Sequence, residues 1–151
     1  MESTQINRVL KTYSYTRNEF CGVLPIDYLP IKKVKRPCSF IINTDKSTLP
    51  GKHWFAIYLP LKGKIEYFDS FGFKPLNEEV YLFFKKNGKW IYNNLQIQNN
   101  NSKSCGKFCA LYVAYRSKGL SKKDFINLFS KNKYNNEKIV KILFKKLFNF
   151  N

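Results

Sequence analysis

The run from His53 to Leu59 constrains the fold of this chain more than any other segment. Its sequence is HWFAIYL, in which nearly every residue is apolar. An almost continuous apolar run of this length is typical of a strand that lies inside a sheet and is buried on both faces. The turn residues at 60–63 lead into an alternating run at 64–68, so we predict that the two runs form an antiparallel hairpin.

Apolar periodicity places the remaining elements before and after this hairpin. Helical spacing predicts helices at 4–14, 78–87 and 105–117, a short one starting at Ser121, and a last one at about 136–149. Apolar runs predict strands at 38–42 and 90–98, prolines predict an ordered loop up to Pro37, and a turn is expected through 43–51. The order of one helix, a group of strands and further helices indicates an α+β fold, with a central mixed or antiparallel sheet packed by helices.

Length and composition are those of one domain covering residues 1–151. Apolar residues make up 44% of the chain, enough to bury a core without disulfides or metals. No apolar run approaches the roughly 18 residues of a membrane span, and the N-terminus lacks the basic and apolar parts of a signal peptide. We therefore expect a monomer made in a reducing compartment, with its four cysteines unpaired.

The formal net charge of +17 is large for a chain of this size. Such a charge favours contact with polyanions, nucleic acid first, through long-range attraction and counterion release. A general bias of composition is the alternative interpretation, because the basic groups are scattered and form no single DNA-reading motif. They lie at 32–36, 85–86, 122–123 and 145–146. The lysine-rich last helix could also lie on a membrane surface, but we expect its apolar stripe to pack on the core.

Four polar residues near the predicted strands and the 105–117 helix form the set that a cysteine hydrolase uses. In chain order they are His53, Asp69, Gln98 and Cys105, and the sequence has no other histidine. The free N–H groups and dipole at a helix N-terminus stabilise a thiolate, which can pair with an imidazole. The hairpin could bring Asp69 to His53 and so orient the ring. Gln98 and the N–H of Cys105 could donate to a developing oxyanion.

Two residues next to the thiol have simpler interpretations. Gly106 leaves room where a substrate backbone must approach closely. Cys105 and Cys109 are separated by three residues and have no second Cys/His pair, so they predict neither a zinc site nor a Cys-x-x-Cys redox motif. We expect Cys109 to pack in the core. Taken singly, His53, Asp69 and Gln98 could also be a structural histidine, a turn residue and a surface glutamine.

In combination these residues resemble the adenain family, the adenovirus-type cysteine proteases, and their relatives that act on ubiquitin-like proteins. The resemblance lies in Gly51-x-His53-Trp54, in a strand that ends in an aromatic residue and Asp69 with Phe-Gly-Phe beyond it, and in Gln98-x6-Cys-Gly-x-Phe-Cys. The segments 41–45 and 20–23 also resemble the family. The resemblance therefore covers roughly residues 3–117.

The resemblance implies a papain-like arrangement with the nucleophile at a helix N-terminus. It implies Cys105 as nucleophile, His53 as general base and acid, Asp69 as the carboxylate that orients the imidazole, and Gln98 with the Cys105 N–H as the oxyanion hole. It also implies a narrow cleft lined by aromatic residues such as Trp54, cleavage at glycine-containing sites, and chemistry that requires no metal or cofactor.

Three features depart from the adenovirus members. Asp69 stands where they have Glu, which is closer to the ubiquitin-like-protein proteases, and the segment 90–98 has no cysteine to which an activator peptide could be linked. The C-terminal portion is also shorter and richer in lysine. DNA or a non-covalent peptide could still activate the enzyme.

We therefore predict a cysteine endopeptidase of a virus or virus-like element that cleaves capsid or core precursor polypeptides. Its expected location is the host nucleus or cytoplasm and the virion. Two alternatives stay open. A deconjugating isopeptidase for ubiquitin or a ubiquitin-like modifier would use the same residues, whereas a basic nucleic-acid-binding structural protein would leave the thiol inert.

Overall fold

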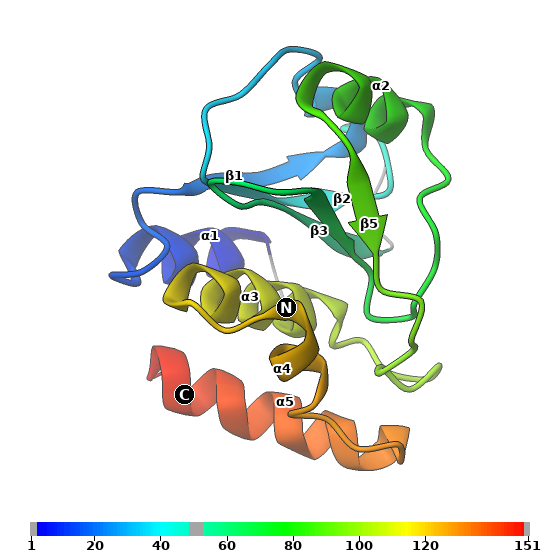
Figure 1. Ribbon diagram of the computed structural model, residues 1–151. Coiled ribbons are helices and arrows are strands. Elements are labelled where there is room, and N and C mark those ends of the chain that lie inside the picture. The colour runs from blue at the N-terminus through cyan, green and yellow to red at the C-terminus, as the bar shows by residue number, and fades with distance from the viewer. Residues whose placement is uncertain (1–2, 49–52, 150–151) are drawn as a thin grey trace.

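A five-stranded mixed sheet lies between helices on both of its faces (Figure 1). The computed structural model describes residues 3–48 and 53–149. Within these ranges the strands lie in the sheet in sequence order: β1 (Phe20–Pro25), β2 (Cys38–Asn43), β3 (Trp54–Leu59), β4 (Ile65–Phe68) and β5 (Trp90–Tyr92). The strands β2, β3 and β4 pair antiparallel, while β1 and β5 add parallel edges. The prediction of an α+β fold with a central mixed sheet is confirmed.

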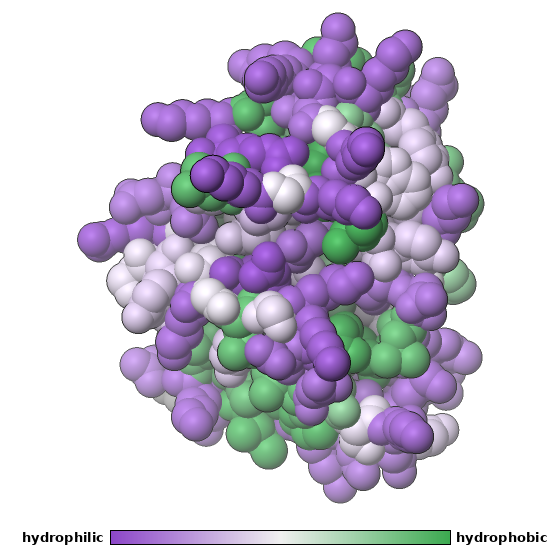
Figure 2. All heavy atoms as spheres, in the orientation of Figure 1, coloured by the Kyte–Doolittle hydropathy of each residue, from purple (hydrophilic) through white to green (hydrophobic). Residues whose placement is uncertain are grey.

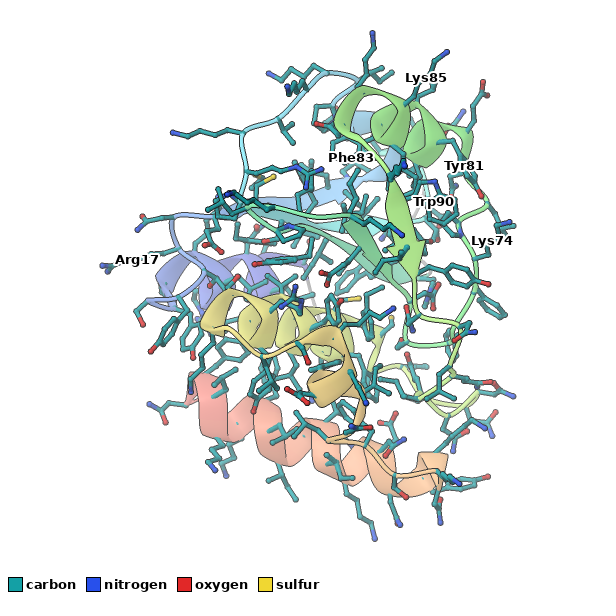
Figure 3. All side chains as sticks on the ribbon, viewed as in Figure 1. Arg17, Lys74, Tyr81, Phe83, Lys85 and Trp90 are labelled. Carbon is teal, nitrogen blue, oxygen red and sulfur yellow. The ribbon has the colours of Figure 1, made fainter. Side chains whose placement is uncertain are left out.

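The helices form one layer on each side of the sheet. Their bounds are α1 (Ser3–Thr12), α2 (Glu78–Asn87), α3 (Cys105–Lys118), α4 (Lys122–Ile126) and α5 (Lys133–Phe148), with a short 3-10 helix at Ile26–Tyr28. Figure 1 shows α2 above the sheet, where the 3-10 helix contacts it, with α1 and α3 below the sheet and α4 and α5 under α3. In Figure 3 the α2 side chain of Phe83 points to the sheet, whereas Lys85 points away from it. Phe83 is fully buried.

The strand β3 is buried on both faces, as its apolar run predicts. Ala56 and Tyr58 belong to the core shared with α1, α3 and α5. Phe55, Ile57 and Leu59 alternate with them and belong to the second core, under α2. Because successive side chains of a strand point to opposite faces, only an apolar run can fill both cores.

Two predicted segments differ from the structure. The expected loop before Pro37 contains β1, which pairs in parallel with β2 and has a bulge between Phe20 and Gly22. Parallel pairing depends on a distant partner, so the local glycine and proline pattern hides the strand. The predicted strand 90–98 stops at Tyr92 because Asn93 uses its side chain to bond the backbone of Asp69.

Side-chain caps begin both C-terminal helices. The Ser121 hydroxyl accepts a hydrogen bond from the Asp124 N–H at 3.1 Å, which begins α4. The helix α5 begins three residues before the predicted 136, because Asn132 caps it through the Tyr134 N–H at 3.0 Å. Its residues Val140 and Phe144 are buried against α3, so the apolar stripe packs on the core as expected.

The face of the molecule seen in Figure 2 is mostly polar. Figure 2 shows polar side chains across the face in view, with apolar side chains gathered where α4 and α5 lie. Among the described residues, no helix is both long enough and apolar enough to cross a membrane. The predicted turn residues Pro50 and Gly51 lie outside the described part of the chain.

Candidate active site

His53 and Asp69 meet at one end of the β3–β4 hairpin. His53 precedes β3 and Asp69 follows β4, and the antiparallel register Ala56↔Phe68 places the two ends side by side. The His53 Nε2 and Asp69 Oδ2 atoms are 3.0 Å apart. The other carboxylate oxygen accepts the Phe71 N–H at 2.8 Å. The hairpin therefore brings the carboxylate to the imidazole, as the sequence suggested.

Asn93 fixes the backbone of Asp69 and was not recognised from sequence. Its side-chain Oδ1 accepts the Asp69 N–H at 2.9 Å, and its Nδ2 donates to the Asp69 carbonyl at 2.6 Å. Asn93 is buried. The sequence signal for Asn93 was a polar residue inside the otherwise apolar start of the segment predicted as a strand, 90–98. The His53 ring is covered by Phe71, with ring centroids 5.0 Å apart.

Cys105 is the first residue of α3 and lies within hydrogen-bonding contact of His53. Burial alone raises the pKa of its thiol. The contact with His53 and the backbone N–H groups of Trp54 and Gly106 outweigh burial, so the pKa lies below its ordinary value. The position at a helix N-terminus acts in the same direction.

The pKa of His53 shifts upward, opposite to that of Cys105. Burial favours the neutral ring, but the hydrogen bonds to Asp69 and Cys105 outweigh it and raise the pKa of His53 to about 9. Since Nε2 bonds Asp69, Nδ1 is the ring nitrogen left for the thiol. The lowered pKa of Cys105 and the raised pKa of His53 both favour a thiolate beside an imidazolium, with the Asp69 carboxylate on the other side of the ring.

Gln98 is fully buried and lies on the irregular segment between β5 and α3. Its side-chain Oε1 accepts a hydrogen bond from the Ser70 hydroxyl. Its Nε2 lies 3.1 Å from the carbonyl and 3.0 Å from the hydroxyl of Ser102. The interpretation of Gln98 as a surface residue is therefore wrong, and its amide is held at both ends.

Gly106 has a different neighbour from the one expected. It is buried, and a Cβ atom placed on it would lie 2.5 Å from the Trp54 ring and 2.9 Å from Ile6. The room beside Gly106 is thus filled by the protein itself rather than left for a substrate backbone. Trp54 is partly exposed and remains available at the site.

The other thiols differ in their surroundings, although all four cysteines are free. Cys109 is fully buried, its thiol donates to the Trp54 carbonyl at 3.4 Å, and burial raises its pKa well above the ordinary value. Its predicted place in the core is confirmed. In the described ranges, no group of three or more His, Cys, Asp and Glu side chains is arranged to hold a metal ion.

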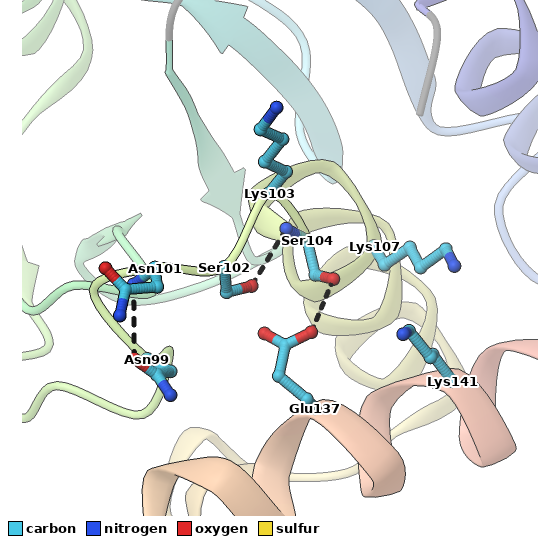
Figure 4. Close-up of a pocket in the computed structure, with 8 residues that line it drawn as sticks. All are labelled: Asn99, Asn101, Ser102, Lys103, Ser104, Lys107, Glu137 and Lys141. Atoms are coloured by element: carbon cyan, nitrogen blue, oxygen red, sulfur yellow. Dashed lines mark hydrogen bonds between the residues drawn. The ribbon is translucent and has the colours of Figure 1, made fainter.

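A polar cavity of about 370 Å³ lies beside the segment that leads into α3 (Figure 4). Its lining comes from that segment, from α3 and from α5: Asn99, Asn101, Ser102, Lys103, Ser104, Lys107, Glu137 and Lys141. The Ser104 hydroxyl donates to Glu137 at 2.8 Å across the cavity wall. The cavity therefore borders the segment between Gln98 and Cys105.

No family model matches the chain. A protein of African swine fever virus named as a cysteine protease is 30% identical over 118 residues, which are 68% of this chain and 43% of that protein. The same match in other isolates carries the name SUMO-1 cysteine protease. The chain thus spans less than half the length of the curated relatives that it matches.

Solved structures share the fold. The crystal structure of the pS273R protease of African swine fever virus aligns with a TM-score of 0.65 at 20% identity, over 92% of this chain and 65% of that one. The Ulp1 protease domain in complex with SMT3, the yeast ortholog of SUMO, aligns with a TM-score of 0.50 at 13% identity, over 96% and 78%. The 30% identity over 68% of the chain shows that it belongs to the family of the African swine fever virus cysteine protease. The solved structures show that it shares the fold of the Ulp1 protease domain. These similarities do not single out the adenain family.

Proposed function

We propose that this chain is a viral cysteine endopeptidase. The observation that carries the proposal is the line of thiol, imidazole and carboxylate formed by Cys105, His53 and Asp69. The similarity to proteins named as cysteine proteases supports it independently.

In the proposed reaction, the Cys105 thiolate attacks the carbonyl carbon of the scissile peptide bond. The His53 imidazolium gives its proton to the leaving amine, and a thioester remains on Cys105. The neutral imidazole then takes a proton from the water that attacks the thioester, which releases the carboxyl product and restores the Cys105 thiolate and the His53 imidazolium. Asp69 keeps the ring oriented throughout. The Cys105 N–H would donate to the oxyanion in both steps, whereas the buried Gln98 amide would have to leave its bonds to Ser102 to act as the second donor.

The proposed substrates are capsid or core precursor polypeptides of the virus that encodes the chain, cut at glycine-containing sites. The viral origin of the named relatives supports a role in virion maturation. The partly exposed Trp54 ring next to His53 is suited to a narrow cleft that admits small residues. The proposed locations are the host nucleus or cytoplasm and the virion.

Removal of a ubiquitin-like modifier is the second candidate function. The observations that favour it are the name SUMO-1 cysteine protease among the relatives and the Ulp1 structure that contains SMT3. Asp69 in place of Glu agrees with this group. Both functions would use the same thiol and differ in the polypeptide that reaches it.

DNA is a proposed partner and activator on the basis of charge. The net charge of +17 would attract a polyanion to the surface of a monomer. No cofactor is proposed for the peptide hydrolysis itself. A DNA effect should weaken steeply as salt rises, because phosphate contacts release counterions.

The test uses the purified chain with peptides that contain Gly-Gly or Gly-x sites, in the presence and absence of DNA. Cys105→Ala serves as the inactive control. Cleavage by the wild type alone supports the endopeptidase. Reaction of Cys105 with an electrophilic probe built on a SUMO C-terminus, without peptide cleavage, would favour the deconjugating function. If neither substrate reacts, both proposals are wrong.

A further inference from the structure

Three basic segments that lie far apart in the sequence meet at the end of the molecule where α2 lies. They are residues 31–36, 62–64 and 85–90, which contain four, two and three basic residues and no acidic one. The basic groups look scattered in sequence, whereas the fold gathers nine of the 27 Lys and Arg residues on one surface. We refer to the three segments together as the basic face.

Asn87 and Arg36 hold the three segments together. At the last residue of α2, the Asn87 side chain accepts the Val34 N–H at 2.8 Å and donates to the Lys32 carbonyl at 2.9 Å. The Arg36 guanidinium donates to the Asn87 carbonyl at 2.9 Å and to the Gly63 carbonyl at 2.6 Å. These bonds involve backbone groups, one amide and one guanidinium, so the segments lie side by side without the use of any lysine ammonium group.

The eight lysines of the basic face are all exposed. No ion pair among the described residues involves any of them. The acidic residues of α2, Glu78 and Glu79, lie in its first turn, at the other end of the helix. Asp27, on the 3-10 helix that contacts α2, is hydrogen-bonded to Ser47. A group of like charges without a counterion attracts a polyanion.

A hollow of about 420 Å³, lined by aromatic rings and lysines, opens on the basic face. Its lining residues are Tyr81, Phe84, Lys85, Gly88, Lys89 and Trp90. The partly exposed Trp90 ring stacks on Phe84 with centroids 5.0 Å apart, and it meets Tyr81 edge-on at 5.6 Å. Figure 3 shows Tyr81 and Trp90 near each other, with Lys85 pointing outward from α2. The rings hold one another in place, so the aromatic surface exists before any ligand binds.

Positive charge beside aromatic rings matches one class of polyanion. In a single-stranded nucleic acid, phosphates follow one another along the backbone and the faces of the nucleobases are free to stack on side chains. A duplex keeps its nucleobase faces inside the stack, and an acidic peptide has no nucleobases. Because Lys85 and Lys89 line the same hollow as Trp90, a nucleobase stacked on the indole would bring its neighbouring phosphates to these lysines.

We propose that the basic face binds single-stranded nucleic acid, with phosphates on its lysines and a nucleobase stacked against Trp90 in the hollow. The inference rests on the part of the proposed function that names DNA as a partner, and it adds the surface and the single-stranded form. Trp90 pairs with Ile65 at the start of β4, whereas Asp69 follows the opposite end of that strand. The binding surface is therefore separate from the reacting residues.

The first test compares two pairs of lysines with the same charge. Lys85→Gln with Lys86→Gln changes the last turn of α2, and Lys145→Gln with Lys146→Gln changes the last turn of α5, where both lysines are also exposed. Each double variant loses two positive charges. Fluorescence anisotropy measures the binding of a fluorescein-labelled oligothymidylate of about 12 nucleotides to the whole chain.

The two double variants should differ in affinity and in salt dependence. At about 0.1 M salt the α2 pair should weaken binding by about 10- to 30-fold, and the slope of log affinity against log salt should fall by about 1.4, because each phosphate contact on a single strand contributes about 0.7. The α5 pair should weaken binding by less than about twofold, since charges more than about 10 Å away are screened.

The second test uses Trp90 to detect stacking. Oligothymidylate should quench tryptophan fluorescence in the wild type but not in Trp90→Phe, which keeps a ring on Phe84 and leaves Trp54 as the only tryptophan. Trp90→Leu should weaken binding by roughly fivefold or more with an unchanged salt slope, because it removes a stacking surface and no charge. An adenylate–thymidylate duplex of the same length should bind at least about fivefold more weakly, because its nucleobases are already stacked.

Equal weakening by the two lysine pairs would mean that only net charge matters, and it would overturn the proposal. Absence of Trp90 quenching, or a duplex that binds as tightly as the single strand, would also overturn it. Cleavage of a glycine-containing peptide without nucleic acid should stay within about twofold of wild type in all four variants, which lie away from the reacting residues. If the wild type binds as expected but cleaves no peptide, the peptidase function is wrong and the surface stands.

Discussion

Cys105 and Cys21 both have a lowered thiol pKa, but one lies at a helix N-terminus and the other in an edge strand of the sheet. Cys105 begins α3 and shares a half-buried site with His53 and two backbone N–H groups. Cys21 lies in the bulge of the edge strand β1 and is exposed. A hydrogen bond with Cys38 is the main cause that lowers the pKa of Cys21 to about 7.

A lowered thiol pKa alone does not make a hydrolytic site. The only histidine of the sequence bonds Asp69 and Cys105, so Cys21 has no imidazole that could pass a proton to a leaving group. A thiolate alone can be alkylated. Hydrolysis of a peptide bond also needs an acid for the leaving amine and donors for the oxyanion. Four predictions test this division.

The largest effect is expected from the nucleophile. Cys105→Ala should lower peptide cleavage by at least about 10⁴-fold, because removal of a covalent nucleophile leaves only binding and oxyanion stabilisation. Cys21→Ala should retain wild-type kcat/KM within about twofold, since an exposed residue away from the site has little effect. Initial rates with one glycine-containing peptide measure both. Equal losses in the two variants would remove the distinction between the regions.

The next effect concerns the carboxylate that orients the imidazole. Asp69→Asn should lower kcat by about 10²–10⁴-fold, because the ring loses its charged partner. Asp69 raises the pKa of His53, so the variant should lose the imidazolium at lower pH. In the wild type, kcat should fall as pH rises through about 9, where His53 gives up its proton; in Asp69→Asn this fall should begin at lower pH. An unchanged pH profile would count against the assignment.

A smaller effect is expected on the reactivity of the thiol itself. His53→Ala removes the leading contact that lowers the pKa of Cys105, so the pKa should rise. Alkylation by iodoacetamide at pH 6.5 should slow by on the order of tenfold, and its midpoint should move to higher pH. Site-resolved mass spectrometry provides Cys21 as an internal control in the same sample. A parallel slowing of Cys21 would indicate unfolding instead.

The smallest effect should appear at the sheet edge. Cys38→Ala removes the hydrogen bond that lowers the pKa of Cys21, so the pKa should rise from about 7 toward the ordinary value. Alkylation of Cys21 at pH 7 should slow by about two- to fivefold, because the thiolate fraction falls. Cys105 should react as before, and peptide cleavage should not change. A change at Cys105 would show that the two regions are coupled.

The sequence predicted the parts of the fold that depend on local pattern. The apolar run of β3 and the hairpin turn are signals within a few residues, and they also implied that Asp69 would meet His53. The strand β1 was missed because its partner β2 is distant and pairs in parallel. Periodicity carries no information about such pairing.

The reacting residues of the candidate site could be predicted from the sequence, but the residues that hold them in place could not. Cysteine, histidine and carboxylate chemistry identified the residues that meet. Asn93 and Ser102 are ordinary polar residues in sequence, and only the folded chain shows that they hold Asp69 and Gln98. Gly106 was assigned room for a substrate, whereas the room belongs to the Trp54 ring from another element.

That contact between Trp54 and Gly106 works as a spacer between the two reacting groups. Trp54 follows His53 in the chain, and Gly106 follows Cys105. A Cβ atom at position 106 would lie 2.5 Å from the indole ring, so only glycine lets the start of α3 lie this close to the residue that follows His53. One methyl group at position 106 would push strand and helix apart at the point where proton and thiolate must meet, so the separation of the pair is controlled by neighbours that take no part in the chemistry.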